Sequence, residues 1–538
     1  MPIRHPERSE AEPKGLSSPI AQDRSLGFAS LRSGRRRMLA GAMALAATHR
    51  AWAQGTPKKG GVLKVSAPTN PSSLDPATGG SGQDHAFLYP IFDTLVEFDF
   101  PTLKALPGLA ESWKFPDTKT LVLNLRAGVQ FHDGTPLDAE AVKFNLERNK
   151  TDARSSIKAD LLTVDAIEVT GPLQVTLKLK QPDSALPLIL SDRAGMMCSP
   201  KAVKELGKDH DRKPVGSGAY RCTGWNDNEK VTYVRNDKYW KQGLPLLDGL
   251  EFAVIAETNT GLRSVVAGQN DFVYFLSPQQ KTVIDRAKNL TAVTGPTLYC
   301  VQIFLNYGRP PLDNPKISLA INHAIDRVAF SKATMGGLAE PAWMALPSAH
   351  WAYDAKLADG WPHDPDKAKK LLAEAGHAGG IDITILGYSD QRSQQRQEVL
   401  MEQLAKGGIR VKWQTGSIPE MSAAFFGDKK GEGLLAAWTG RPDPSLTYAL
   451  MFAKDSYYNA GRTEWSPELT AALLETRASE DLEARKAAFA KVQKIVVDAA
   501  LVVPLVFQLE LDAQVAKVKG YRPNLLGKPR FDGVWLES

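Results

Sequence analysis

Apolar and polar residues alternate along short stretches in the first half of the chain. Two of these stretches, 121–126 and 175–180, place leucine or valine at every second position, and 231–235 is a third candidate. Alternation with a period of two is typical of a strand that buries one face. Turn-forming residues separate the stretches, as in HDGTP at 132–136. The first half is therefore predicted to be rich in β-strands.

In the second half, apolar residues recur three and four positions apart, which predicts helices. Asp364 and Pro365 mark the beginning of one helix, because Asp caps free N–H groups and Pro suits the first turn. Gly376 is a good left-handed end for it. A helix that opens at Asn314 is predicted to carry its apolar face as far as Val328. The predicted helices span 314–328, 364–376, 467–477 and 482–499.

A strand-like apolar run, LVVPLVF at 501–507, follows the last long helix. A late strand of this kind often returns to pair with an earlier sheet, which predicts a discontinuous N-terminal domain. The chain shows no strict alternation of strand and helix and no fixed repeat. Its 538 residues are more than a domain with one hydrophobic core usually contains. The fold class is therefore predicted to be mixed α/β with two or more domains.

Composition and charge narrow the class of protein. Hydrophobic residues make up 43% and charged residues 23%, which is typical of a soluble globular protein. Of the net charge of +6, residues 1–53 carry +5, from nine Lys/Arg and four Asp/Glu. The remainder is nearly neutral and has no electrostatic footprint for nucleic acid. The sequence contains no run of 18 or more apolar residues, so no membrane span is predicted.

The basic excess lies in a segment that resembles a bacterial twin-arginine export signal. Arg35 and Arg36 precede a weakly apolar run over 40–47, and Ala51-Trp52-Ala53 offers a small-x-small cleavage site. The alternative is a disordered basic arm on a cytosolic protein. We expect export to the periplasm and leave residues 1–53 out of the fold prediction.

Three cysteines are present, Cys198, Cys222 and Cys300. None lies near Gln54, so a soluble protein without a lipid anchor is expected after cleavage. An exported protein could oxidise Cys198 with Cys222, but sequence does not show whether their Cα atoms come close enough. The odd count leaves at least one free thiol.

Motifs of catalysis are missing from the sequence. It contains no phosphate loop of the form GxxxxGK[ST] and no HExxH. Gly216-Ser217-Gly218 lacks the spacing of a nucleophile elbow. Histidines are scattered, and no pair of carboxylates stands out. We therefore expect no enzyme activity, no metal site and no cofactor.

Blocks in a fixed order along nearly the whole mature chain resemble the extracytoplasmic solute-binding proteins of ABC importers, in the dipeptide/oligopeptide/nickel-binding family 5. The block at 107–148, PGLAESWKFPDTKTLVLNLRAGVQFHDGTPLDAEAVKFNLER, is the most diagnostic. The other blocks are GGVLKVSAPTNPSSLDPA (60–77), FDTLVEFD (92–99), PVGSGAYR (214–221) with RNDKYW (235–240), FLNYGRPPLDNPKISLAINHAIDR (304–327), HDPDKAKKLLAEAG (363–376) and YNAGR (458–462).

The resemblance implies a large, type II-like fold of two α/β lobes joined by a hinge, with the solute in the central cleft. The first lobe is expected at 54–298 plus 504–538, with an extra subdomain at about 90–225, and the second at 299–503. Such proteins close around their solute by hinge motion. The implied partners are a small peptide-like or other organic solute and the ABC permease in the inner membrane. We expect a monomer; the alternatives are a periplasmic hydrolase and a non-transport, sensory binding protein.

The loop AAWTGRPDPS at 436–445 departs from the family pattern. In the peptide binders of the family, an Asp in this loop pairs with the α-ammonium of the peptide, and Arg441 stands where that Asp would be. Arg binds carboxylates bidentately, so a solute with an anionic group near Arg441 is predicted. Trp438 is expected to line the cleft, and Asp443 to be structural. The alternatives are that Arg441 turns outward or pairs with an acid, and that Trp438 is ordinary core.

Further candidate ligand residues lie in two other segments. Arg392 falls near the position of a carboxylate-binding Arg in dipeptide binders, and its alternative is a solvated arginine at a helix start. The loop with Asn70, Ser72 and Ser73 is expected to face the cleft from the first lobe, where its polar groups could hydrogen-bond the solute.

Overall fold

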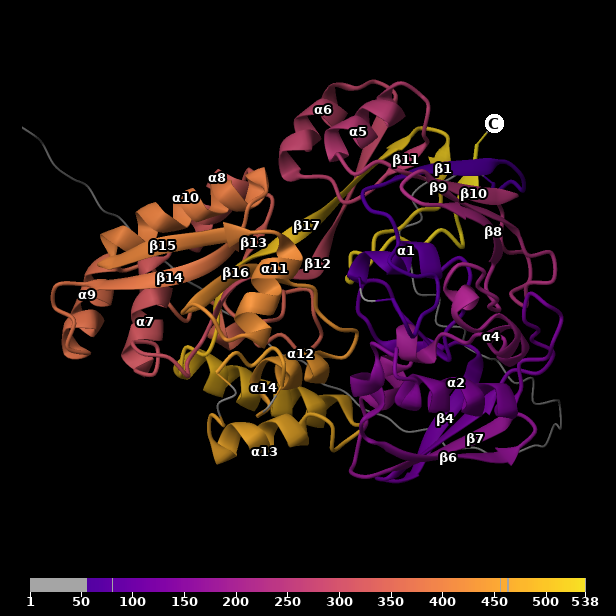
Figure 1. The fold of residues 1–538 in the computed structure, drawn as a ribbon, viewed down its shortest axis with the longest axis horizontal. Helices are drawn as coiled ribbons and strands as arrows, with labels where there is room; N and C mark the ends of the chain where they lie inside the picture. The colour runs from indigo at the N-terminus through magenta and orange to yellow at the C-terminus, as the bar shows by residue number, and fades with distance from the viewer. Residues whose placement is uncertain (1–55, 80, 455, 462–463, 538) are drawn as a thin grey trace, which may run out of the picture. The chain divides into compact units, whose positions relative to one another are not determined.

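The computed structural model of the protein describes residues 56–537 apart from residues 80, 455, 462 and 463. The predicted export signal and its cleavage site lie outside the described residues. The described chain is mixed α/β, in agreement with the sequence (Figure 1). None of the described helices is long and apolar enough to cross a membrane.

One large sheet dominates the structure. Within the described residues it has eleven strands in the order β15-β14-β16-β12-β17-β11-β1-β10-β9-β8, with β13 paired to β17. Its strands are β1 (Val62–Ala67), β8 (Tyr220–Asn226), β9 (Lys230–Arg235), β10 (Gly249–Val254), β11 (Phe272–Val273), β12 (Leu290–Leu305), β13 (Glu340–Pro341), β14 (Ile381–Tyr388), β15 (Ile409–Gly416), β16 (Gly433–Trp438) and β17 (Val503–Val515).

Two long strands, β12 and β17, run side by side through the middle of this sheet (Figure 1). They pair antiparallel, with a shift of register between Pro296 and Cys300. Residues of the apolar run pair with β12, and Ala513 and Gln514 farther along β17 pair with β11. This late strand therefore joins a sheet that contains earlier strands, as predicted. The lobe boundaries expected from the sequence, 298/299 and 503/504, fall on these two strands.

A separate four-stranded sheet has the order β4-β5-β7-β6, and α2 packs against it. It lies within the segment expected to form the extra subdomain. Its elements are β4 (Ala110–Asp117), β5 (Thr120–Leu125), β6 (Val164–Gly171), β7 (Gln174–Leu179) and α2 (Ala139–Thr151). Two small hairpin-like pairs are β2 (Val96–Phe98) with β3 (Ala105–Pro107) and β18 (Val518–Lys519) with β19 (Trp535–Leu536).

The remaining helices are α1 (His85–Leu88), α3 (Leu186–Ile189), α4 (Pro200–Leu206), α5 (Thr258–Val266), α6 (Lys281–Arg286), α7 (Pro315–Ala324), α8 (Arg327–Met335), α9 (Pro365–Glu374), α10 (Gln391–Lys406), α11 (Ile418–Ser422), α12 (Pro444–Phe452), α13 (Pro467–Glu475) and α14 (Leu482–Asp498). Three of the four predicted helices are confirmed, as α9, α13 and α14. In α9 the Asp364 carboxylate accepts a hydrogen bond from the Lys367 N–H, as expected of an N-cap.

The predicted helix over 314–328 is wrong in its second half. α7 ends at Ala324, and Ile325 has an extended backbone with φ −100° and ψ 120°. Asp326 then caps a new helix, α8, by accepting from the Ala329 N–H. Val328 therefore lies on another helix and is 64% exposed instead of buried. Apolar residues on both sides of the break keep a helical spacing, although they belong to two different helices.

Buried apolar residues form clusters that largely separate along the chain. Several clusters combine residues from the first half with residues beyond 510, and others use residues 300–507. Leu446 of α12 is an exception, since it packs into the cluster of the β4–β7 sheet. Each of the two long strands, β12 and β17, therefore has one end in one group of clusters and the other end in the other group.

Candidate functional site

A cavity of about 1330 Å³ lies beside the paired strands β12 and β17. It is somewhat larger than the roughly 300–1000 Å³ of typical ligand sites, so it has room for a small solute. Segments from both sides of the expected lobe boundaries line it, including the first turns of α10, the end of β16, and the loop at 526–529. Among its described lining residues none is a histidine or cysteine.

Two arginines one helical turn apart, Arg392 and Arg396, line the cavity from α10. Arg396 is only 8% exposed. Its Nη2 lies 3.5 Å from Oε1 of Gln508, and its Nε has no hydrogen-bond partner. Burial, reinforced by the charge of Arg392, lowers the pKa of Arg396 to about 10. Burial also lowers the pKa of Arg392. The cavity wall on this side is therefore cationic.

Lys528 lines the cavity from the C-terminal segment. Its Nζ lies 3.5 Å from Oδ2 of Asp192. Burial lowers the pKa of Lys528 to about 8, although the attraction of Asp192 opposes the shift. The charge of Arg441 adds to the lowering, which places Arg441 near this part of the wall.

The loop at 436–445 holds Trp438 and Arg441 just behind the cavity wall. Ala437 and Thr439 line the cavity, whereas Trp438 and Arg441 do not. Trp438 is 4% exposed and packs in a core cluster with Tyr448. Arg441 is half-buried and donates from Nη1 to its own loop, to the Gly440 carbonyl at 3.0 Å. Its guanidinium carbon lies 5.5 Å from the centre of the Trp438 ring.

Two other residues of this loop fix its shape. Gly440 has φ +72°, and a Cβ there would lie 2.4 Å from the side chain of Leu298. Asp443 is fully buried, caps α12, and accepts two hydrogen bonds from Arg485 Nη2 at 2.8 and 2.9 Å. The predicted structural role of Asp443 is confirmed.

The polar groups of Asn70, Ser72 and Ser73 are engaged within the first-half loops. Asn70 accepts from the indole N–H of Trp225 at 3.1 Å. Ser72 donates from its hydroxyl to Asp84 at 2.6 Å, and Ser73 is 2.8 Å from the Thr78 hydroxyl. These three residues are not among those that line the cavity; Pro68 and Thr69 of the same segment are.

Sequence reasoning thus named Arg392 among the lining residues and missed Arg396, Tyr299, Gln508, Lys528 and Thr69. Arg396 had a recognisable signal. It lies four and eight residues before Leu400 and Leu404, which are fully buried on the same face of the helix. This spacing predicts that the Arg396 side chain is buried too.

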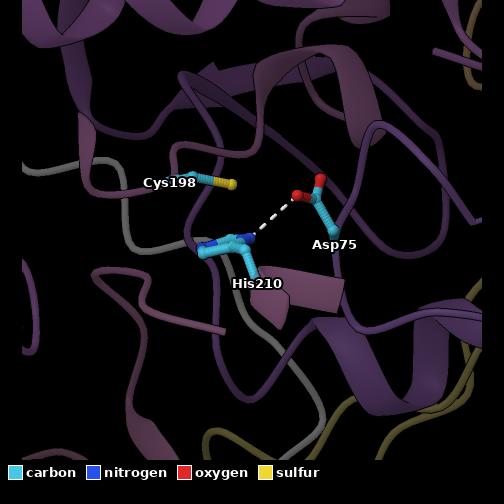
Figure 2. Close-up of side chains that lie close together, drawn as sticks. All are labelled: Asp75, Cys198 and His210. Carbon is cyan, nitrogen blue, oxygen red and sulfur yellow. Dashed lines mark hydrogen bonds and ion pairs between the residues drawn. The ribbon is translucent and has the colours of Figure 1, made fainter. Parts of the chain in front are cut away.

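A second cluster of polar side chains, away from the cavity, joins Asp75, Cys198 and His210 (Figure 2). Their potential ligand atoms lie within 4.8 Å of one another. Arg148 donates to both carboxylate oxygens of Asp75, at 3.1 and 2.6 Å, and His210 Nδ1 lies 2.8 Å from Oδ2. The Val215 N–H donates to His210 Nε2 at 3.3 Å.

The contacts of this cluster suit a structural role better than a metal site. Both oxygens of Asp75 and both nitrogens of His210 already have partners, and burial raises the pKa of the Cys198 thiol well above its usual value. Burial alone would raise the pKa of Asp75, but the hydrogen bonds from His210 and Arg148 outweigh it and hold that pKa well below its usual value. The three cysteines are free in the structure.

Comparison with known proteins decides the family. A family model described as "Bacterial extracellular solute-binding proteins, family 5 Middle" matches residues 104–460. The chain belongs to this family. The family 5 protein is 33% identical over 382 residues to the glutathione-binding protein GsiB of Salmonella paratyphi A, covering 70% of this chain and 74% of that relative. It is 32% identical over 383 residues to GsiB of Escherichia coli.

Solved structures agree on the fold. The ABC transporter-associated periplasmic binding protein DppA of Helicobacter pylori, in complex with the peptide STSA, matches with a TM-score of 0.79 and 25% identity. The match covers 89% of this chain and 99% of DppA. The two-lobe binding-protein fold expected from the sequence is therefore confirmed. The family 5 protein is a solute-binding component of an ABC importer, and its family is one of binding proteins and not of enzymes.

Proposed function

We propose that this family 5 protein captures a peptide-like solute with an anionic group in the 1330 Å³ cavity and delivers it to an inner-membrane ABC permease. The observation that carries the proposal is the charge of the wall, where Arg392, Arg396 and Lys528 face the cavity. The acids that also line it, Asp390 and Glu398 among them, are exposed. Relatives named as glutathione-binding support a peptide-like solute with carboxylates.

We further propose that residues 54–298 with 504–538 form the first lobe, with an extra subdomain at about 90–225, and 299–503 the second. The separation of the apolar clusters supports this division. We propose that the mature protein is a soluble periplasmic monomer, exported by the signal-like segment 1–53 and not lipid-anchored. The extracellular location in the description of its family supports the export. Asn70, Ser72, Ser73 and Trp438 would then act by holding the loops that border the cavity.

Arg441 and Lys528 together offer one region for an anionic group of the solute. Arg441→Ala is expected to weaken binding of an anionic solute by about 1 kcal/mol, because Arg441 lies behind the wall and attracts the anion through its charge without lining the cavity. Titration calorimetry of both proteins with the same solute measures the difference. A loss below about 0.5 kcal/mol would remove Arg441 from the site.

A thermal-shift panel tests the binding role itself. Glutathione, tripeptides and their amidated forms are added to the purified protein, since a ligand that binds only the folded state stabilises it by RT ln(1 + [L]/Kd). We expect carboxylate-bearing members to raise the melting temperature and to be recovered unchanged. Time-dependent conversion of a solute by the pure protein would contradict the binding role and favour a hydrolase.

A further inference from the structure

Arg396 is a buried cation that has no carboxylate partner within the described part of the chain. Its only hydrogen-bond contacts are long, 3.5 Å to Oε1 of Gln508 and 4.0 Å to Sδ of Met335, and its Nε has none. Other buried arginines of the described chain have a carboxylate or backbone carbonyls as partners, although the Nε of Arg193 and of Arg530 is also unpaired. Arg485, for example, pairs with Asp443, and Arg327 donates to backbone carbonyls at 2.8 and 2.9 Å.

The surroundings of Arg396 make its charge harder to keep. Arg392 lies one turn earlier on α10, and the N-terminus of this 16-residue helix adds further positive potential. The acids near it along the chain, Glu398 and Asp390, are both exposed. Asp390 is used as the N-cap of α10, accepting from the N–H and the hydroxyl of Ser393 at 3.1 and 2.6 Å.

Uncharged donors converge on the same spot. Tyr299 from β12 and Gln508 from β17 line the large cavity with both arginines. Together with Arg392 they also line a small adjoining cavity of about 30 Å³. Two guanidinium groups, a phenol and a carboxamide thus line the large cavity together, and of the two arginines only Arg392 also lines the small one.

A buried charge is costly unless it is paired and hydrogen-bonded. An arginine held this way has no stabilising role in the unliganded protein, and its guanidinium fork matches a carboxylate. We propose that Arg396, with Arg392, Tyr299 and Gln508, forms a subsite that takes a carboxylate of the solute out of water. This inference rests on the proposed function and names the group that enters this end of the cavity.

The subsite has a definite chemical selectivity. Arg396 and Arg392 supply only donors, so a carboxylate satisfies them, whereas a primary amide of the same shape presents an NH2 group to them. It is separate from the region of Arg441 and Lys528, because no contact joins those residues to Arg396 among the described interactions. A solute with two carboxylates can therefore use both.

Succinate and its neutral isostere succinamide test the subsite at constant ionic strength. The protein is freed of solute by unfolding and refolding, and its melting temperature is followed as each probe is added. We expect succinate to raise the melting temperature saturably and succinamide to leave it unchanged. In Arg396→Met the succinate shift is lost, and affinity for any solute found in the panel falls at least about 30-fold. Equal shifts for both probes, or no succinate shift in the unaltered protein, would overturn the proposal.

Matched variants separate this subsite from general effects of charge. Arg410 of β15 forms an exposed ion pair with Asp382 of β14. Arg410→Met removes the same charge there and is expected to keep the succinate shift. Arg396→Met should raise the melting temperature of the unliganded protein, whereas a structural arginine would lower it. A panel solute that binds Arg396→Met unchanged would sink the subsite and leave the binding role standing. If succinate raises the melting temperature but no solute of the panel does, the subsite stands and the proposed peptide-like solute is contradicted.

Discussion

Asp75→Ala is expected to lower the free energy of unfolding by about 3–5 kcal/mol, the usual cost of removing one partner from a buried ion pair. Asp75 is fully buried, and its loss would leave the His210 imidazole without its acceptor and the Arg148 guanidinium with only a longer ion pair, 3.7 Å to Asp152. Arg148 is 9% exposed and His210 is fully buried, so water cannot replace the lost oxygens. Urea unfolding followed by circular dichroism measures the change.

Cys198→Ala is the matched control in the same cluster. It removes one buried sulfur, which is a weak hydrogen-bond partner of Arg148, but it leaves Asp75 as the acceptor of Arg148 and His210, so a cost of only about 1 kcal/mol is expected. A metal site would give another pattern, in which Cys198→Ala costs as much as Asp75→Ala and a chelator destabilises the unaltered protein. A cost below about 1 kcal/mol for Asp75→Ala would contradict the structural role of the cluster.

A second large effect is expected from pH at the buried carboxyl pair Glu510 and Asp512 of β17. The Tyr521 Oη lies 2.7 Å from Asp512 Oδ2 and 3.1 Å from Glu510 Oε1, and the Phe275 N–H donates to Asp512 Oδ1 at 3.1 Å. Burial raises the pKa of Asp512 to about 6 and, with the charge of Asp512, raises the pKa of Glu510 well above its usual value.

The sign follows from proton binding. Because the folded protein holds a proton on Asp512 at a pH where the unfolded chain has released it, the contribution of Asp512 is complete below about pH 4 and is lost as the pH rises through about 6. A shift of roughly two units corresponds to about 3 kcal/mol. Asp512→Asn cannot ionise, so its stability relative to the unaltered protein should improve by about 3 kcal/mol between pH 4 and pH 7.

The difference between the two proteins is the quantity to measure. Burial lowers the pKa of His85 and of His132 to about 4, which gives the opposite pH dependence, but both histidines are present in each protein and cancel. Asp498→Asn, an exposed residue paired with Lys494, should show no such trend. A stability difference between Asp512→Asn and the unaltered protein that stays constant from pH 4 to pH 7 would contradict the prediction.

Much of the fold could be predicted because local signals and packing agree. Asp364 and Gly376 bound a helix through their own chemistry, and α9 lies between them. The 314–328 segment failed because Asp326 starts a new helix within an apolar pattern that spans the break. The apolar run predicted that a late strand joins an earlier sheet, whereas the pairing of β17 with β11 and along β12 depends on contacts far apart in sequence.

The site was harder to predict because burial decides it. Arg441 was predicted to bind the solute because it stands where the family pattern has an acid. The structure places it behind the cavity wall, hydrogen-bonded to the Gly440 carbonyl. Arg396 lies outside the blocks that resemble the family, yet the fold buries it without a carboxylate partner among the described residues. Lys528 reaches the cavity from the C-terminal segment, which no local motif could reveal.

Native mass spectrometry of protein purified without denaturation tests the central claim most directly. A binding protein with a buried cationic subsite should carry one noncovalently bound small molecule per chain, and that molecule should bear at least one carboxylate and be absent from Arg396→Met prepared in the same way. A co-purified ligand that is a cation or lacks an anionic group, or one retained equally by Arg396→Met, would contradict the account.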